Sequence, residues 1–330
     1  MLKMFSDCRL ANSPVHYFSK ERNLEEFMKI PKQLLKSVCF LFVRSGGKLT
    51  PVGTAFFIHI EEGLHTFLYL ATAKHVVKCM REHSDNDHFF IRVNSKEGKS
   101  LFIENSFEQW EYHVDSRVDA AVMKVEPYLP ENQYDYLSVP ISMMPTKDLL
   151  ECQISIGEEV CVVGLLQGYW GKEKNTPIPI LGNLAYISEE EPEQYLINAT
   201  TVPGYSGSPV FSYSHGMLET FLKKAINERL EKETDSRDVL SHSGLTDETQ
   251  ARQLYWLGLL HAERRYWSEE KGEKHLFDTG ISLVTPASKI AEIIDSSIFK
   301  DDREQTIRKG INYPQKPLKS DGSRIVKYLP

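Results

Sequence analysis

The feature that most constrains the fold of this chain is a series of twelve short segments rich in Val, Ile, Phe and Tyr, separated by Gly, Pro, Asn and charged residues. Such segments are typical of β-strands joined by turns. They fall into two groups of six, at 38–44, 54–60, 66–72, 88–94, 100–103 and 119–125, and at 159–165, 180–188, 195–200, 208–213, 254–263 and 279–285. Two such groups predict an all-β fold of two six-stranded antiparallel β-barrels, because closure hides the strand edges.

The rest of the chain is arranged around these two groups. We expect an N-terminal helical preface at 1–36, the first barrel at 37–126, a proline-containing linker at 127–155, the second barrel at 156–300 and a polar tail at 301–330.

Two helical patterns interrupt or end the second group. Apolar residues at three- and four-residue spacing in 216–233 predict an amphipathic helix within an insertion at about 214–253. Its apolar face either packs on the rest of the chain or docks a regulatory protein partner, and both alternatives stay open. Thr285 as the N-cap and Pro286 as the first helical residue predict a C-terminal helix. Its apolar face would consist of Ile290, Ile293, Ile294 and Ile298.

Composition argues against several classes of function. The net charge is −7 and the isoelectric point about 5.9, so we expect no nucleic-acid partner. The basic residues of the tail, including Arg303, are predicted to be solvated. The sequence has no secretory h-region and no stretch of roughly 18 apolar residues, so we expect no membrane partner. Five widely spaced cysteines predict reduced thiols in a cytoplasmic protein, with no metal and no cofactor.

Three short segments carry residues suited to acyl transfer, namely ATAKHVV at 71–77, VDAAV at 118–122 and PGYSGSPV at 203–210. A serine hydroxyl is a weak nucleophile that needs a neighbouring base, and an imidazole suits that role near neutral pH. A buried carboxylate must then hold the imidazole in the right tautomer. His113 and Asp115, just before the second segment, are predicted to belong to a charged loop.

These requirements assign a role to one residue of each segment. Ser206 is predicted to be the nucleophile, His75 the general base and Asp119 the residue that orients the histidine. The backbone N–H groups of Gly204 and Ser206 are predicted to form the oxyanion hole, because a glycine two residues before the nucleophile lets the two amides converge.

The same residues carry a resemblance. TAKHVV, VDAAV and GYSGSPVF, in the order His, Asp, Ser, resemble the chymotrypsin/trypsin-like serine peptidase family, and most closely its bacterial, disulfide-free, glutamyl-endopeptidase-like members. GTAFF at 53–57 resembles the family's GTGF-type strand, and GNLAY at 182–186 is similar to the strand before its serine loop. The resemblance spans about 38–298. It implies a double six-stranded barrel with the active site between the barrels, a polypeptide substrate and serine endopeptidase activity.

One position departs from the family pattern. Trypsins made as zymogens carry an aspartate immediately before the serine, and here Tyr205 occupies that position. Activation by N-terminal cleavage is therefore not expected, and the bulk of Tyr205 leaves open whether the oxyanion loop is formed at rest. The alternative function is a catalytically silent trypsin-like fold that serves as a protein-binding or scaffolding module.

The resemblance also implies a substrate pocket. LGLLHA at 257–262 resembles the GxH-containing strand of glutamyl endopeptidases, so His261 and Thr201 would hold an acidic side chain or Gln before the scissile bond. Ala262 would line the pocket, and Arg264 would add positive potential at its mouth. This predicts cleavage after Glu, with Gln or Asp next. The alternative is that His261 is a satisfied core histidine and that the pocket takes a small or apolar residue.

Overall fold

The structure is a computed structural model that describes residues 30–125, 129–130, 132–152, 154–188, 190, 193–214, 253–270 and 273–309. Only the backbone is described at 152, 213–214, 253, 262–270 and 273–278. The chain divides into two units, Met1–Pro31 and Lys32–Pro330, and the elements below belong to the second. The predicted preface helix and the predicted helical insertion lie outside the described residues.

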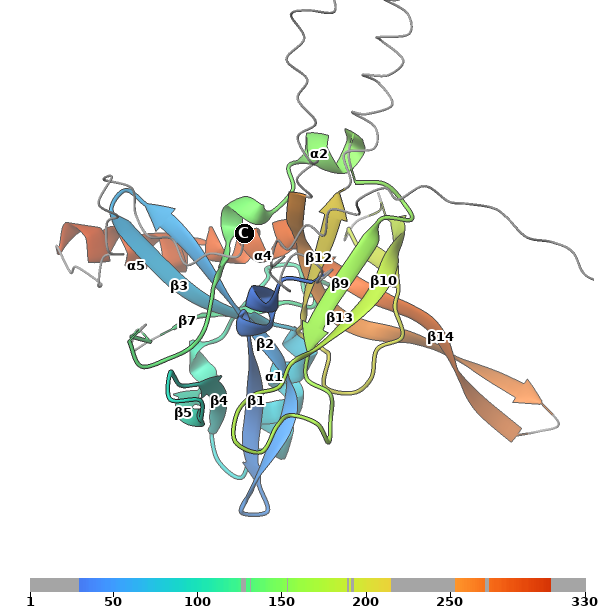
Figure 1. Cartoon of the computed structure of the whole chain (residues 1–330), viewed down its shortest axis with the longest axis horizontal. Helices are drawn as coiled ribbons and strands as arrows, with labels where there is room; N and C mark the ends of the chain where they lie inside the picture. The colour runs from blue at the N-terminus through green and yellow to red at the C-terminus, as the bar shows by residue number, and fades with distance from the viewer. Residues whose placement is uncertain are drawn as a thin grey trace, which may run out of the picture. The chain divides into compact units, whose positions relative to one another are not determined.

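The first group of strands forms one eight-stranded sheet (Figure 1). The strands are β1 (Val38–Ser45), β2 (Lys48–Glu62), β3 (His65–Thr72), β4 (His88–Asn94), β5 (Ser100–Ser106), β6 (Glu111–Tyr112), β7 (Ala121–Lys124) and β8 (Val139–Pro140). Their order is β5–β4–β1–β2–β3–β7–β6, and β8 pairs in parallel with β2. Each of the six predicted segments overlaps one strand, β1 to β5 or β7, whereas the two-residue strands β6 and β8 were not predicted.

The second group forms a closed barrel in the order β10–β11–β14–β13–β12–β9. The strands are β9 (Glu159–Gly164), β10 (Ile178–Ile187), β11 (Tyr195–Asn198), β12 (Pro209–Ser214), β13 (Gln253–Glu270) and β14 (Glu273–Pro286). All neighbouring strands of the barrel pair antiparallel. The predicted all-β fold class is confirmed: the second group closes into the predicted six-stranded antiparallel barrel, whereas the first group forms an eight-stranded sheet in place of the predicted six-stranded one.

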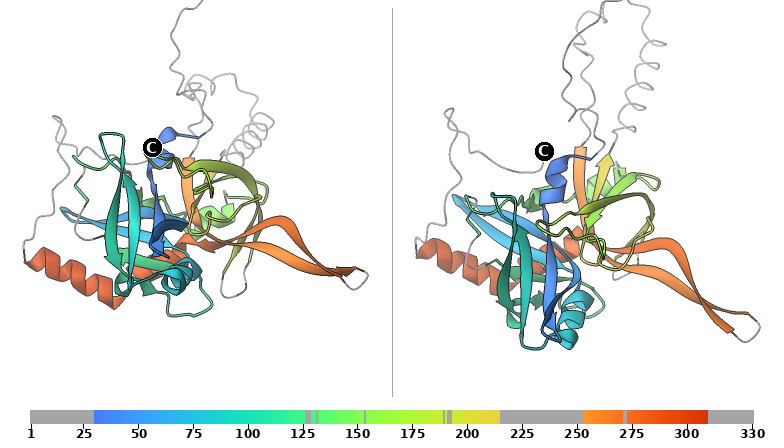
Figure 2. Two further views of the ribbon diagram at one scale, coloured as in Figure 1. Left: turned by 90° about the horizontal axis from the view of Figure 1, so that it is seen from below. Right: turned by 60° about the horizontal axis from the view of Figure 1, so that its bottom comes forward.

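The last two strands of the barrel are longer than predicted. β13 and β14 stay paired from Gly258↔Pro286 to Glu270↔Glu273, and the resulting hairpin projects away from the barrel (Figure 2). The sequence analysis ended these strands early because the hairpin sequence mixes charged and aromatic residues without strict alternation.

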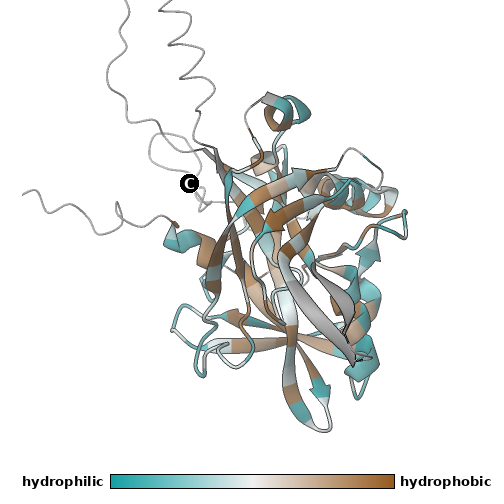
Figure 3. Cartoon of the chain, turned by 90° about the vertical axis from the view of Figure 1, so that its right-hand side faces the viewer, coloured by the Kyte–Doolittle hydropathy of each residue, from teal (hydrophilic) through white to brown (hydrophobic). Residues whose placement is uncertain are grey.

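The core of the second barrel consists of apolar side chains from all six strands. In β11, Tyr195 and Ile197 are buried while the residues between and after them are more exposed, as expected for a strand with one face in the core. Hydrophobic positions run along the strands of both sheets, and many connecting turns are hydrophilic (Figure 3). The buried cluster comprises Ile154, Val160, Val162, Leu184, Tyr195, Ile197, Ala199, Tyr205, Val210, Tyr255, Leu257, Leu260 and Val284. Full burial of one large aliphatic side chain stabilises the folded state by about 1.5–3 kcal/mol.

Short helices accompany the sheets. They are the 3-10 helices η2 (Lys32–Lys36), η3 (Phe107–Gln109) and η4 (Ile141–Met143), and the α-helices α1 (Lys74–His83), α2 (Lys147–Cys152), α4 (Ala287–Ile294) and α5 (Ser297–Arg308). The segment predicted as a linker contains η4 and α2 in addition to β8. No helix in the described part of the chain is long and apolar enough to cross a membrane.

The C-terminal helix begins one residue later than predicted. Pro286 is the N-cap of α4, and the hydroxyl of Thr285 interacts with His261 instead of capping the helix. Ile290 and Ile294 are buried as predicted, whereas Ile298 is exposed and belongs to α5. Because α5 continues to Arg308, the first residues of the predicted polar tail are helical.

Arg303 on α5 is buried, so the prediction that it is solvated is wrong. Its guanidinium donates to the carboxylate of Glu62 (2.5 Å), the hydroxyl of Tyr69 (3.1 Å) and the carbonyl oxygen of Ile294 (2.8 Å). These contacts join α5 to β2 and β3, beside which the helix runs (Figure 1). A buried cation is tolerated because its donors are paired.

We expect Arg303→Ala to lower the free energy of unfolding by about 3–5 kcal/mol, because it leaves the partners of a buried ion pair without their donor. Urea denaturation followed by circular dichroism measures this. Arg308→Ala is the matched control, since Arg308 pairs with Glu304 while 77% exposed and such pairs contribute about 0–1 kcal/mol. Equal effects of the two substitutions would contradict a structural role for Arg303.

Candidate active site

His75 lies in the first turn of α1, directly after β3. The helix starts there because Ala73 keeps an extended backbone, with φ −74° and ψ 139°. Val76, Val77 and Met80 bury one face of the helix. The side chain of His75 lies off this face and is 45% exposed.

Asp119 binds His75 through both carboxylate oxygens. The distance between His75 Nδ1 and Asp119 Oδ2 is 2.6 Å, and the backbone N–H of His75 donates to Oδ1 (2.8 Å). The two residues meet because β3 and β7 pair at Thr72↔Ala121, close to the end of one strand and the start of the other. The Asp119 side chain is 20% exposed, so this pair is held partly away from water.

The electrostatics favour an ionised Asp119. Burial opposes ionisation, but the hydrogen bond from the His75 side chain and the charges of His75 and His261 outweigh it, so the pKa of Asp119 is lowered. An ionised carboxylate only accepts hydrogen bonds, so the neutral form of the His75 ring carries its proton on Nδ1 and keeps the lone pair on Nε2. Nε2 is therefore free to act as a base.

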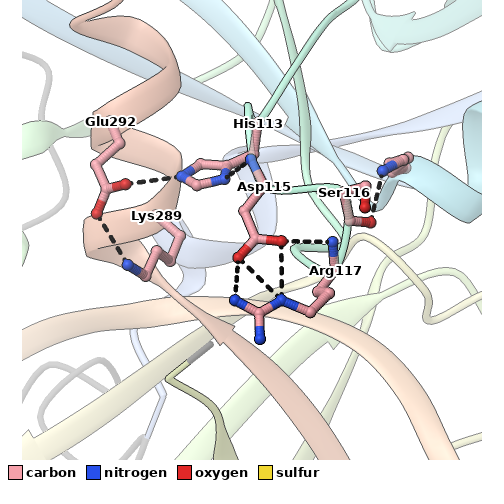
Figure 4. A network of polar contacts seen from close by, with 7 residues as sticks. His113, Asp115, Ser116, Arg117, Lys289 and Glu292 are labelled. Atoms are coloured by element: carbon pink, nitrogen blue, oxygen red, sulfur yellow. Dashed lines mark hydrogen bonds and ion pairs between the residues drawn. The ribbon is translucent and has the colours of Figure 1, made fainter. Parts of the chain in front are cut away.

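The loop before Asp119 is held by its own ion pair (Figure 4). Arg117 binds Asp115 through its guanidinium (2.7–3.1 Å) and its backbone N–H (2.9 Å), and these contacts hold the pKa of Asp115 at about 2. The side chain of Lys74, one residue before the histidine, donates to the carbonyl oxygen of Ser116 (2.9 Å). The predicted charged loop therefore ties the aspartate segment to the start of α1.

The same loop is anchored to α4 through His113 (Figure 4). The backbone N–H of Asp115 donates to His113 Nδ1 (3.0 Å), so Nδ1 is the unprotonated nitrogen of a neutral ring and Nε2–H donates to Glu292 (2.7 Å). Lys289 also binds Glu292 (3.1 Å). His113 is thus engaged in holding the loop in place.

Ser206 lies in a glycine-dependent bend that leads into β12. Gly207 has φ +87°, and a Cβ there would lie 2.1 Å from the carbonyl oxygen of Thr54. The Gly207 N–H donates to the carbonyl oxygen of Leu260 (2.7 Å), and the Thr54 N–H donates to that of Ser206 (3.1 Å). A Cβ on Gly53 would meet both the Val76 side chain and the carbonyl oxygen of Ser206. The serine backbone therefore lies next to the helix that carries His75.

The serine hydroxyl is held only weakly. In the described part of the chain, Ser206 Oγ donates to the carbonyl oxygen of His261 at 3.5 Å and forms no hydrogen bond with His75. A contact of this length is a poor hydrogen bond. Rotation about one side-chain bond reorients the hydroxyl, and catalytic hydrogen bonds are often loose before substrate binds.

Two backbone amides of the serine loop, those of Gly204 and Ser206, have no acceptor among the described residues. Among the described residues, neither the N–H of Gly204 nor that of Ser206 donates a hydrogen bond, although the neighbouring amides of Tyr205, Gly207 and Ser208 all do. Gly204 is buried and has φ +104°. Unpaired N–H groups at a partly buried site are unfavourable unless a ligand accepts from them. A negatively charged oxygen next to Ser206 would satisfy both.

Tyr205 packs into the barrel core and is 1% exposed. Its hydroxyl donates to the carbonyl oxygen of Ile178 (2.9 Å), and burial, with a smaller contribution from Cys161, raises the pKa of Tyr205 to about 12. Gly164 makes room for the ring, because a Cβ there would lie 2.9 Å from it. Tyr205 therefore anchors the serine loop to the second barrel.

His261 lies next to the His75–Asp119 pair. It is 8% exposed, its Nδ1 lies 3.0 Å from the hydroxyl of Thr285, and that hydroxyl donates to the backbone oxygen of Asp119 (3.4 Å). Burial lowers the pKa of His261, the charge of Asp119 opposes this shift and that of His75 adds to it. The structure thus connects His261 to the aspartate, while the sequence had left it open between the substrate pocket and a satisfied position in the core.

Thr201 is also buried and engaged within the barrel. Its hydroxyl lies 3.0 Å from that of Ser282, which donates to the carbonyl oxygen of Ala199 (2.9 Å). The side chains of Ala262 and Arg264 lie outside the described residues. The structure therefore brings His75 and Asp119 together with the Ser206 loop, and gives Thr201 a partner across the barrel.

Sequence reasoning missed the contributions of Thr285 and Thr54. Thr285 was interpreted as a helix cap, and Thr54 was noticed only as part of the GTAFF strand. A buried hydroxyl in an otherwise apolar strand was the available signal, because such a group requires a partner. In the part of the chain that the structure describes, no cluster of three or more His, Cys, Asp or Glu residues could hold a metal ion.

Comparisons with known proteins add little to this site. No model of a protein family matches the sequence, and no curated protein matches it. Among solved structures, the chain is similar to a variant of the HtrA-type protease AlgW with a tripeptide, at 14% identity and a TM-score of 0.43. The match covers 82% of this chain and 62% of that chain.

Proposed function

We propose that this chain is a serine endopeptidase in which Ser206 is the nucleophile, His75 the general base and Asp119 the residue that orients His75. The observation that carries the proposal is the 2.6 Å contact between His75 Nδ1 and Asp119 Oδ2, together with the amides of Gly204 and Ser206, which have no acceptor among the described residues. Peptide-bond hydrolysis requires an oriented imidazole with an available Nε2 and N–H donors for the oxyanion.

The steps follow from these positions. Ser206 Oγ attacks the carbonyl carbon of a peptide bond while its proton moves to His75 Nε2, and the amides of Gly204 and Ser206 hydrogen-bond the oxyanion. The C–N bond then breaks, and His75 gives the proton to the leaving amine. Water then attacks the acyl-enzyme and gives its proton to His75, the bond between Ser206 Oγ and the acyl carbon breaks, and His75 returns the proton to Oγ as the acid is released. Asp119 stabilises the imidazolium in both halves.

A fluorophosphonate probe tests this function, because it reacts only with an activated serine. We expect labelling of the native chain, no labelling of Ser206→Ala, and cleavage of an unfolded polypeptide by the native chain alone. Labelling that persists in Ser206→Ala would refute the assignment of the nucleophile.

The alternative, a catalytically silent fold that serves as a protein-binding or scaffolding module, is favoured by one observation. Ser206 Oγ is directed at the carbonyl oxygen of His261 and not at His75. A chain that takes no probe and cleaves no polypeptide, with or without a candidate partner protein, would support this alternative. A cytoplasmic location and regulation through the segment 214–253 stay predictions.

The proposed preference is cleavage after Glu, with Gln or Asp next. Residues 199–204 include no Asp or Glu that could receive Lys or Arg. The proposal requires the Thr201 hydroxyl to turn from Ser282 to the substrate carboxylate in the complex, so we expect Thr201→Val to lower kcat/KM for Glu substrates by about 10- to 100-fold relative to Leu substrates. His261→Ala should show the same loss of preference and also a lower kcat on every substrate, since His261 neighbours Asp119.

A peptide library in which only the residue before the scissile bond varies measures both effects. A profile dominated by Lys and Arg, or by large apolar residues, would refute the acidic preference and leave the endopeptidase proposal intact. A fall in kcat for His261→Ala without any change of preference would show that His261 supports Asp119 and does not bind the substrate side chain.

A further inference from the structure

Thr54 on β2 connects the first sheet to both segments that border the serine loop. Its side chain is fully buried. The hydroxyl donates to the carbonyl oxygen of Gly204 (2.8 Å) and accepts from the backbone N–H of Leu165 (2.9 Å), so both roles of the hydroxyl are used. Leu165 follows β9. A Cβ on Gly204 would lie 2.7 Å from the carbonyl oxygen of Leu165, so the two segments are in close contact. One hydroxyl therefore links two adjacent segments of the second barrel.

The backbone of Thr54 binds the same loop. Its N–H donates to the carbonyl oxygen of Ser206 (3.1 Å), and its own carbonyl accepts from the hydroxyl of Thr72 (2.7 Å). Thr54 therefore holds the carbonyl groups of Gly204 and Ser206, which are two residues apart. The peptide that carries the N–H of Ser206, for which no described residue is an acceptor, lies between these two fixed peptides.

Fixing two flanking peptide planes restricts rotation of the one between them, because each backbone dihedral is shared with a neighbour. Tyr205 adds a third constraint, since its N–H donates to the carbonyl oxygen of Val202 (3.2 Å) and its ring is buried in the barrel core. The direction of the Ser206 N–H is thus decided by contacts on both sides. A preorganised donor stabilises an oxyanion without reorganising when the charge forms.

We propose that Thr54 is a positioning residue that sets the geometry of the oxyanion hole from the opposite sheet, an inference that rests on the proposed endopeptidase function. Valine has the same shape but neither donates nor accepts, so it would leave the Gly204 carbonyl and the Leu165 amide buried without this partner. Serine keeps the hydroxyl and loses only a methyl group.

The test compares Thr54→Val, Thr54→Ser and the native chain on one peptide substrate. We expect Thr54→Val to lower kcat by about 10- to 100-fold with KM changed less than about threefold. The reason is that the N–H of Ser206, which Thr54 positions, binds the oxyanion of the transition state and not the ground-state substrate. Thr54→Ser should restore kcat to within about threefold of native. Ser37→Ala is the matched control, since it removes a buried hydroxyl that donates to the carbonyl oxygen of Leu34 (2.7 Å), and its kcat should be native.

A second readout separates positioning from stability. Affinity for a peptide aldehyde, whose adduct places an oxyanion beside Ser206, should fall with kcat in Thr54→Val, whereas affinity for the peptide product should not. If Thr54→Val does not fold, Thr54→Ala is measured in its place. A native kcat in the folded Val or Ala variant, or a loss in Thr54→Ser as large as in Thr54→Val, would overturn the inference. A native chain without Ser206-dependent activity would overturn the proposed function, and this inference with it.

Discussion

Replacement of Ser206 or of His75 by alanine is expected to lower kcat by about four to six orders of magnitude. Without the hydroxyl no acyl-enzyme forms, and without the imidazole nothing takes the hydroxyl proton. Because the two groups act in one proton transfer, the double variant should lose little more than either single variant. Initial rates on a fluorogenic peptide, at equal concentrations of folded protein, measure all three. An additive loss in the double variant would show that the two residues act independently.

Ser208→Ala is the matched control for the nucleophile. Ser208 Oγ is buried and has no hydrogen-bond partner among the described residues, so its removal breaks no hydrogen bond of the loop. We expect native kcat in this variant. Native activity should also survive chelators and reducing agents, since the mechanism uses neither a metal nor a disulfide. Strong inhibition by EDTA, or full activity in Ser206→Ala, would refute the proposed mechanism.

Asp119→Asn is expected to lower kcat by about 10⁴-fold while the fold is kept. The two oxygens of Asp119 accept the backbone N–H and the Nδ1–H of His75, and an asparagine offers only one oxygen. If its amide nitrogen faces Nδ1, the ring must carry its proton on Nε2, which removes the base. A pH–rate profile and the ¹H NMR signal of the Nδ1 proton report the change of tautomer.

Asp115→Asn is the matched control for charge in the same loop. Asp115 binds Arg117 and the backbone around it but does not contact His75, so kcat should change by less than about tenfold. Equal kinetic losses in Asp119→Asn and Asp115→Asn would contradict the role of Asp119.

The stability of the native chain should also depend on Asp119. Because the pKa of this carboxyl is lowered on folding, its contribution is complete above pH ~4 and is lost as the pH falls through the lowered value.

Features of the fold that depend on neighbouring residues could be predicted from the sequence, and features that depend on contacts between distant residues could not. The strands were predictable because alternation and turn residues are local, and all twelve segments contain strands. The ends of β13 and β14 were not, since a hairpin beyond the barrel is stabilised by its own pairing and carries no core pattern. Arg303 was misjudged because a charged residue in a polar segment does not reveal that Glu62, more than two hundred residues away, lies beside it.

For the site, the sequence alone determined which residue types can do the chemistry and in which strand groups they lie. His75, Asp119 and Ser206 stand out because each lies at the end of a strand or in a glycine bend, which are local features. Tertiary structure alone decided where side chains point. It directed Tyr205 into the barrel and His261 toward Asp119, and it brought the hydroxyl of Thr54 to Gly204 across 150 residues of sequence. These outcomes depend on which sheets face each other, and a one-dimensional pattern does not encode the direction of a side chain toward a partner from another sheet.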